Sequence, residues 1–235
     1  MSESIFRFKQ FSIRHDQCAM KVGTDGVLLG AWSPLFSPRR ILDIGSGSGL
    51  VALMVAQRVP EAEIVGVEIH EPSYLQSLQN VAESPFSHRV RIVCQDIREY
   101  SPEELFDHIL CNPPFYTQDI LPLDSARSQA RNASHLPLEE LVVSVSRLLN
   151  KEKGSFSVIL PYESMANFVT LCLREALYLS DVCTVRTVEK KAPKRVLLNF
   201  VRAIPDQTHT EMLVLQSENG LRTPQYDFLT REFYL

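Results

Sequence analysis

The tetrapeptide Asn112-Pro113-Pro114-Phe115 holds the residues whose types and spacing best suit chemistry. It follows an apolar segment, residues 106–111, that we expect to form a buried strand. Two successive prolines cannot donate the hydrogen bonds of a β-sheet, so the strand must end at Asn112. In an open α/β sheet, ligands bind at the carboxyl ends of the strands. The tetrapeptide is therefore predicted to lie at a ligand site.

These residue types suit a reaction on a planar amino group. The side-chain oxygen of Asn112 and the carbonyl oxygen of Pro113 can both accept hydrogen bonds from one NH2 group. Phe115 offers a ring face on which a base can stack. The alternative interpretation is structural: the strand ends in a sharp turn, and Phe115 packs in the core. The segments that precede the tetrapeptide favour the chemical interpretation.

A glycine-rich turn, residues 45–49, lies between an expected strand over residues 40–44 and an expected helix over residues 50–59. Glycines let the backbone approach a ligand closely, and the helix N-terminus carries partial positive charge. Two ligand classes compete. The spacing from Gly47 to Ala52 fits the dinucleotide fingerprint. The stretch 43–49 fits D-x-G-x-G-x-G, which resembles motif I of the S-adenosylmethionine-dependent methyltransferases; a turn without a ligand is the third possibility.

Acidic residues follow the next two expected strands. Glu68 ends the strand over residues 63–67, where an acid can bind both ribose hydroxyls of a nucleotide. NAD enzymes and methyltransferases share this feature, so Glu68 does not discriminate between them. Asp96 follows the strand over residues 90–94, where methyltransferases place an acid that accepts from the adenine amino group of the cofactor. The alternative for Asp96 is a loop or cap residue.

The composition of the 235 residues is that of a globular protein, with 45% hydrophobic and 22% charged residues. The net charge of −4 argues against non-specific binding of nucleic acid through overall charge, and leaves room for a local basic patch. No apolar run is long enough to span a membrane, and the polar first residues are not a signal peptide. We expect a soluble cytoplasmic protein. The cysteines are scattered, lack metal-ligand spacing and are expected to be reduced thiols: Cys18, Cys94, Cys111, Cys172 and Cys183.

Two basic segments could face a polyanion. The first lies in a long polar connection, residues 117–137, and contains Arg127, Arg131 and His135. The second joins two expected strands, residues 181–188 and 195–203, and contains Lys190, Lys191, Lys194 and Arg195. The alternatives are solvated loop charges for the first segment and a solvated hairpin tip for the second.

Strands and helices are expected to alternate along the chain, which predicts an α/β fold with a mostly parallel sheet. The start of the chain, residues 5–18, is expected to be a strand or extended arm. A helix is expected to follow it, with Thr24 or Asp25 as its N-cap. Further helices are expected over residues 72–82, 138–149, 164–177 and 226–235, a helical turn over 101–105, and strands over 156–160 and 212–215.

The order of these features resembles that of a Rossmann-like class I methyltransferase. The N-P-P-[FY] tetrapeptide resembles that of enzymes that methylate planar NH2 groups. The N-terminal block, residues 8–11 and 15–32, is similar to the start of the bacterial tRNA1(Val) (adenine-37-N6)-methyltransferase family. The similarity extends over almost the whole chain, through residues 42–54, 112–115, 129–131, 195–198 and 233–235. Phe115 stands where some relatives carry Tyr, a change that keeps stacking and removes a phenol hydroxyl.

The resemblance implies one methyltransferase domain over residues 1–235, with residues 1–38 as an N-terminal arm and capping helix. The core, residues 39–235, would hold a seven-stranded, mostly parallel sheet with an antiparallel final pair. The implied reaction is S-adenosylmethionine-dependent methylation of N6 of adenosine 37 in the anticodon loop of tRNA1(Val), without a metal.

The resemblance also implies the residues of the site. The catalytic residues would be Asn112, Pro113 and Phe115. The cofactor would be bound by Thr24, Asp43, Gly45, Gly47, Gly49, Glu68, Asp96 and Asn112. Three other functions remain open: methylation of a ribosomal RNA guanine or a protein glutamine, an NAD(P)-dependent oxidoreduction supported by the glycine turn and Glu68, and RNA binding without catalysis.

Overall fold

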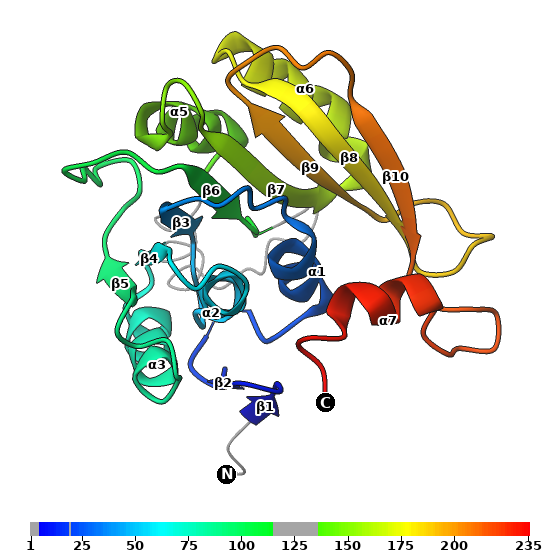
Figure 1. Ribbon diagram of the computed structural model, residues 1–235, viewed down its shortest axis with the longest axis horizontal. Helices are drawn as coiled ribbons and strands as arrows, with labels where there is room; N and C mark the ends of the chain where they lie inside the picture. Colours follow the sequence, from blue (N-terminus) through cyan, green and yellow to red (C-terminus); the bar gives the residue numbers. More distant parts are fainter. Residues whose placement is uncertain (1–4, 19, 115–135) are drawn as a thin grey trace, which may run out of the picture.

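The computed structural model describes residues 5–18, 20–114 and 136–235, which form a sheet with helices on both faces (Figure 1). The strands of this sheet are β3 (Arg40–Ile44), β4 (Glu63–Glu68), β5 (Val90–Cys94), β6 (His108–Cys111), β7 (Ser155–Pro161), β8 (Tyr178–Arg186), β9 (Arg195–Val201) and β10 (His209–Val214). The helices are α1 (Thr24–Trp32), α2 (Leu50–Arg58), α3 (Glu71–Ala82), α5 (Leu138–Leu148), α6 (Met165–Arg174) and α7 (Pro224–Thr230), with a 3-10 turn at Tyr162–Ser164.

The strand order is β10-β8-β9-β7-β6-β3-β4-β5. Within the described residues, neighbouring strands of this sheet pair in parallel, except that β9 is antiparallel to both β7 and β8. The predicted mostly parallel sheet with an antiparallel final pair is confirmed. The predicted count of seven strands is one too low in the described part of the chain. The eighth strand is β10, which overlaps the strand expected over residues 212–215, begins earlier at His209, ends at Val214 and pairs in parallel with β8.

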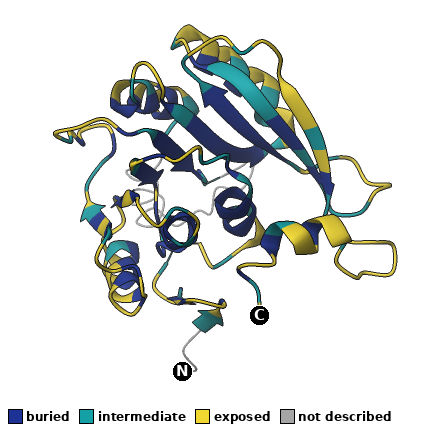
Figure 2. Ribbon diagram, in the orientation of Figure 1, coloured by how far each residue is buried: buried dark blue, intermediate teal, exposed yellow. Residues whose placement is uncertain are grey.

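The central strands are buried on both faces, as expected where helices cover a parallel sheet. Figure 2 shows these strands in the colour of buried residues. In β6, Leu110 packs into the cluster formed with α1 and α2, whereas Ile109 packs into the cluster formed with α5 and α6. The sheet therefore separates two apolar cores, and its carboxyl edge is the place where polar residues can gather.

Several predicted element boundaries were wrong. The N-cap of α1 is Gly23, in an extended conformation and without a side-chain cap, so Thr24 and Asp25 lie inside the first turn. Residues 101–105 form no helical turn. The last helix ends at Thr230, because the backbone amides of Phe233 and Tyr234 donate to the Thr230 carbonyl and close it.

The N-terminal segment forms a hairpin of β1 (Ile5–Arg7) and β2 (Ser12–Arg14) that packs against the C-terminal residues. The backbone amide of Lys9 donates to the Phe233 carbonyl at 2.8 Å. The rings of Phe8 and Tyr234 are stacked, with centroids 6.0 Å apart. The two ends of the described chain lie on the same side of the molecule (Figure 1).

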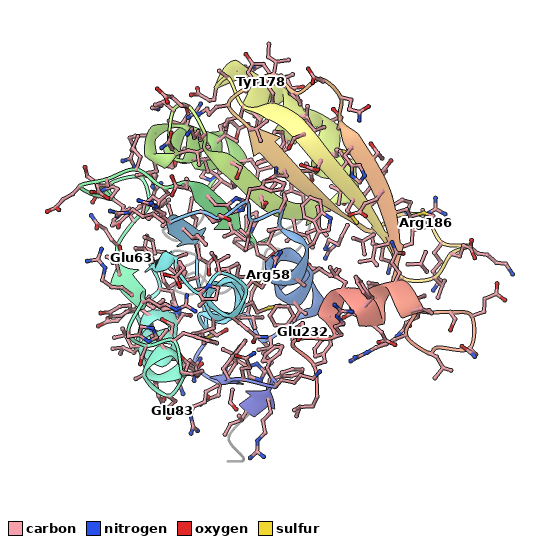
Figure 3. All side chains as sticks on the ribbon, in the orientation of Figure 1. Arg58, Glu63, Glu83, Tyr178, Arg186 and Glu232 are labelled. Carbon is pink, nitrogen blue, oxygen red and sulfur yellow. The ribbon has the colours of Figure 1, made fainter. Side chains whose placement is uncertain are left out.

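The topology decides which loops meet at the carboxyl edge. Because β8 and β7 are both antiparallel to β9, β8 runs in the same direction as β7 and β6. Tyr178 and Arg186 mark the two ends of β8, and the loop over residues 187–194 continues from Arg186 (Figure 3). This basic loop therefore lies at the same edge as Asn112, whereas the loop over 150–154, before β7, lies at the opposite edge.

Helices in the described ranges are all too short or too polar to cross a membrane. The five cysteines are free thiols. Burial raises the pKa of the thiols of Cys111, Cys172 and Cys183, which keeps them protonated at neutral pH.

Candidate active site at the carboxyl edge of the sheet

Two adjoining cavities open at the carboxyl edge, with volumes of about 390 and 300 Å³. Both are lined by Met20, Gly45, Gly47 and Asn112, so the glycine-rich turn and the end of β6 form their common boundary. The larger cavity is also lined by Gln17, Cys18, Glu68, Asp96, Arg98, Pro113 and Pro114. The smaller cavity is also lined by Lys21, Thr24, Asp25, Gly26, Asp43, Ser46 and Leu50.

The glycine-rich turn leaves open space beside both cavities. Gly45 and Gly47 have φ angles of 69° and 54°, a left-handed conformation that side chains rarely adopt. A Cβ atom at Gly45 would meet no atom within 4 Å, and one at Gly47 would meet only the Gly45 carbonyl at 3.9 Å. Gly49, which also has a positive φ, lines neither cavity; it forms the N-cap of α2 and lies against Ser77 of α3.

Glu68 is held rigidly at the end of β4. Its Oε2 atom accepts from the backbone amide of Gly47 at 2.8 Å, and its Oε1 atom accepts from the backbone amide of His70 at 2.7 Å. The side chain is buried. Each carboxylate oxygen keeps a second lone pair, so Glu68 can still accept from a pair of ligand hydroxyls.

Asp96 lies at the far wall of the larger cavity, after β5. Its carboxylate accepts from the guanidinium and the backbone amide of Arg98, which also pairs with Glu140 of α5 at 3.0 Å. The hydrogen bonds from Arg98 lower the pKa of the Asp96 carboxyl, so the group stays ionised and remains a hydrogen-bond acceptor. Sequence reasoning missed Arg98, although its position two residues after Asp96 is typical of a local pair.

Asp43 carries the buried carboxyl group of the smaller cavity. Its Oδ2 atom accepts from the backbone amide of Ala52 in the first turn of α2, at 3.1 Å. Burial raises the pKa of Asp43 to about 8; the charge of Glu68 adds to this rise, and the bond from Ala52 opposes it. A cationic group of a ligand in this cavity would lower the pKa again and ionise Asp43.

Asn112 stands where the two cavities meet. It follows β6 directly, and its Nδ2 atom lies 3.8 Å from the position that a Cβ atom of Gly26 would take. A Cβ atom at Gly26 would lie 3.1 Å from Leu50 Cδ2, so glycine suits the close packing of α1 on α2 beside Asn112. Pro113 and Pro114 continue along the larger cavity. Phe115, Arg127, Arg131 and His135 lie outside the described residues.

The structure separates Arg195, at the start of β9, from the lysines of the basic loop. Arg195 turns toward α1, where its Nε atom donates to Asp25 Oδ2 at 2.8 Å. Lys190 pairs with Glu218 at the surface, and Lys191 and Lys194 are exposed. Arg195 is therefore part of the wall behind the smaller cavity, and the lysines stand outside it.

The residues between β2 and α1 are the largest part of the site that sequence reasoning missed. Gln17, Cys18 and Met20 line the larger cavity, yet this segment has no regular pattern by which one sequence could mark it. Among the described residues, His, Cys, Asp and Glu side chains form no group of three that could hold a metal ion.

The side chains around the glycine-rich turn distinguish between the two ligand classes that its sequence left open, a dinucleotide and S-adenosylmethionine. The ammonium group of an amino acid at this turn would lower the pKa of the Asp43 carboxyl, ionise it and pair with it, whereas the negative charge of a pyrophosphate would raise that pKa further and find no countercharge there. The buried hydroxyl of Ser46, which has no hydrogen-bond partner among the described residues, and the empty space at Gly45 also suit a ligand here. With the strand order of the sheet, these features define a class I S-adenosylmethionine-dependent methyltransferase.

Comparisons with known proteins narrow the class. The family model described as the methyltransferase small domain matches residues 23–140. The tRNA1(Val) (adenine(37)-N6)-methyltransferase of Bacteroides fragilis is 43% identical over all of this chain and 99% of its own length. Enzymes with the same name from Flavobacterium johnsoniae and Citrobacter koseri are 41% and 39% identical, over 98% of this chain and 99% and 94% of their own. The chain belongs to this family, as the resemblance predicted.

Solved structures support the fold alone. A predicted O-methyltransferase from Agrobacterium tumefaciens superposes with a TM-score of 0.69 at 18% identity, covering 89% of this chain and 96% of its own. The glycopeptide N-methyltransferase MtfA, solved with S-adenosylmethionine, gives 0.55 at 12% identity, covering 79% and 89%.

Asp43→Asn tests the electrostatics of the smaller cavity. The carboxyl pKa rises from 3.8 to about 8 on folding, so the folded chain binds a proton more tightly than the unfolded chain. The free energy of unfolding of the wild type should therefore fall as pH rises through this window. Asparagine keeps an acceptor for Ala52 and does not ionise. Without ligand, the variant should melt above the wild type by a margin that grows from about pH 5 to about pH 8.

Thermal unfolding at a series of pH values measures this margin. A difference in melting temperature that does not change with pH would contradict the titration of Asp43. If the smaller cavity binds the amino-acid end of S-adenosylhomocysteine, calorimetry should show weaker binding of this ligand to the same variant, because asparagine offers its ammonium group no negative charge.

Proposed function

We propose that this chain transfers the methyl group of S-adenosylmethionine to N6 of adenosine 37 in the anticodon loop of tRNA1(Val). The observation that carries the proposal is the position of Asn112, which follows β6 directly and lines both cavities. The names of relatives that are 39–43% identical over nearly the full length support the choice of substrate.

The residues assigned to the cofactor follow the two cavities. Glu68 would accept from the ribose hydroxyls, and Asp96 would accept from the adenine amino group. Asp43, with Thr24 at the same cavity, would hold the amino-acid end. Gly45 and Gly47 leave the space in which the cofactor lies. When bound, S-adenosylmethionine supplies an electrophilic methyl group on its sulfonium sulfur.

The target nitrogen is a poor nucleophile, because its lone pair is delocalised into the adenine ring. The side-chain oxygen of Asn112 and the carbonyl of Pro113 would accept its two hydrogens and stabilise the positive charge that develops there. The base would leave its stack in the single-stranded loop and stack on Phe115, a role that rests on the sequence. Such stacking contributes about 1–3 kcal/mol per base. These residues position and stabilise, and the proton then leaves to water.

The lysines of the basic loop are the proposed contacts with the RNA backbone. Lys190, Lys191 and Lys194 stand on the carboxyl edge of the sheet, the edge at which the target base would enter. The roles proposed for Arg127, Arg131 and His135 rest on the sequence. Because tRNA is used in the cytoplasm, we expect the chain to act there.

Nucleoside mass spectrometry tests the function directly. The purified chain is incubated with labelled S-adenosylmethionine and bulk tRNA from a strain that lacks the gene. A new N6-methyladenosine signal, mapped to position 37 of tRNA1(Val), is the expected result. Label in guanine or in a protein glutamine would overturn the target and keep the reaction class, and failure to bind the cofactor would overturn the whole proposal.

Asn112→Ala tests the acceptor at the amino group. Removal of a hydrogen-bond partner that acts on developing charge should lower the rate of methyl transfer at least about a hundredfold. S-adenosylhomocysteine should still bind within about threefold of wild type, since most of the proposed cofactor contacts remain. Single-turnover methylation and calorimetry measure the two effects. Turnover at the wild-type rate would contradict the assigned role.

Lys191→Ala combined with Lys194→Ala tests the RNA contact. A lysine that neutralises a phosphate contributes about 1 to the dependence of log affinity on log salt concentration. The double variant should bind tRNA more weakly and with a slope reduced by about 1–2. Filter binding at several salt concentrations measures this slope.

The matched control for the lysine variant is Lys151→Ala combined with Lys153→Ala, on the loop at the opposite edge of the sheet. The control removes the same charge and should keep the wild-type slope. Equal slopes for both double variants would exclude the basic loop as the RNA contact.

A further inference from the structure

An irregular segment that we call the arm, residues 14–18 and 20–22, forms the outer wall of both cavities. Gln17 and Cys18 line the larger cavity, Lys21 lines the smaller cavity, and Met20 lines both. Beyond Arg14, the described residues of the arm belong to no helix or strand. Their position must therefore be set by hydrogen bonds to other elements.

Asn80 of α3 binds the start of the arm as a neighbouring strand would. Its Oδ1 atom accepts from the Arg14 backbone amide at 2.9 Å, and its Nδ2 atom donates to the Arg14 carbonyl at 2.9 Å. The side chain is 1% exposed, so water cannot replace these bonds. A primary amide is suited to this place because it donates and accepts at adjacent atoms.

Gln76, one turn earlier on α3, binds the middle of the arm. Its Oε1 atom accepts from the Gln17 backbone amide at 3.0 Å and from the Cys18 thiol at 3.1 Å. Its Nε2 atom donates to Asp16 Oδ1 at 2.6 Å. Residues four apart on a helix lie on one face, so α3 presents both amides to the arm together. β2 lies beside α3, and Glu83, which caps the C-terminal end of α3 (Figure 3), pairs with Arg14 of β2 at 3.4 Å.

The same face of α3 also holds the glycine-rich turn. Asn80 Nδ2 donates to the Ser48 carbonyl at 2.8 Å, and Ser77 packs against Gly49. One amide thus connects the inner wall of the site to the outer wall. Neither Gln76 nor Asn80 lines either cavity.

We propose that Gln76 and Asn80 are positioning residues of the cofactor site. They fix the separation between the arm and the glycine-rich turn, and so they set the affinity for the cofactor without touching it. The proposal rests on the proposed function only for the identity of the ligand.

The test uses Asn80→Asp and Gln76→Leu in the full chain. Aspartate keeps the acceptor for Arg14 and loses the donor that faces two carbonyls. Leucine at position 76 removes all three bonds to the arm and keeps a good helix former. Each variant should bind S-adenosylhomocysteine about tenfold more weakly by calorimetry. Hydrogen exchange should become faster in the arm of the ligand-free variants.

Kinetics separate positioning from chemistry. The KM for S-adenosylmethionine should rise in both variants, and kcat at saturating cofactor should stay at the wild-type value. The matched control is Gln79→Leu, which removes an exposed amide from the same helix and should leave affinity, exchange and KM unchanged. A fall in kcat at unchanged KM, or an equal loss in the control, would overturn the proposal.

Two further results would also overturn it: wild-type affinity in spite of faster exchange in the arm, and lost affinity with unchanged exchange. If a variant fails to fold in thermal unfolding, Asp16→Ala decides, because this residue is exposed and its replacement removes the bond from Gln76 Nε2. It should weaken binding about threefold, and unchanged binding would refute the proposal. Failure of the wild type to bind S-adenosylhomocysteine would overturn the proposed function, whereas exchange in the arm would still test the hydrogen bonds.

Discussion

The turn from β3 to α2 is the constraint on which the site depends. Within five residues the chain must leave a buried strand, expose its backbone and enter a helix, and glycine φ angles of 69°, 54° and 80° make this possible. The turn is anchored to β4, because the Gly45 amide donates to the Val67 carbonyl at 2.8 Å and the Gly47 amide donates to Glu68. The positions of Glu68, the start of α2 and both cavities follow from these bonds.

Charge is distributed so that one chain can hold a cation and a polyanion. The acids Asp43, Glu68 and Asp96 line the cavities, where they suit a cofactor with a sulfonium and an ammonium group. The lysines of the basic loop stand outside, on the same edge of the sheet. Arg195 lies between the two groups, paired with Asp25 at the start of α1. A net charge of −4 is compatible with RNA binding because the basic groups are local.

Local features of the fold could be predicted, and features that join distant segments could not. The apolar strand segments and the polar residues that follow them predicted that Glu68, Asp96 and Asn112 lie at one edge of the sheet. The N-cap at Gly23 was missed because Thr24 and Asp25 are the better intrinsic caps, and tertiary packing placed them inside the helix. The pairing of β10 with β8 and the bonds of Gln76 and Asn80 join residues 27 to 66 positions apart, such as Thr184 and Glu211, and no single sequence encodes such partners in a pattern.

The inward face of α3 has a thermodynamic consequence. Four of its five buried residues are polar, namely Ser73, Gln76, Ser77 and Asn80, so this helix is docked by hydrogen bonds more than by apolar burial. Each such bond contributes about 1 kcal/mol, less than a buried leucine side chain. The helix and the arm thus form a unit that opens at a lower free energy than the sheet. Because only the closed unit completes the cavity, ligand binding suppresses this local opening, and the occupied protein is stabilised most strongly at its own binding site.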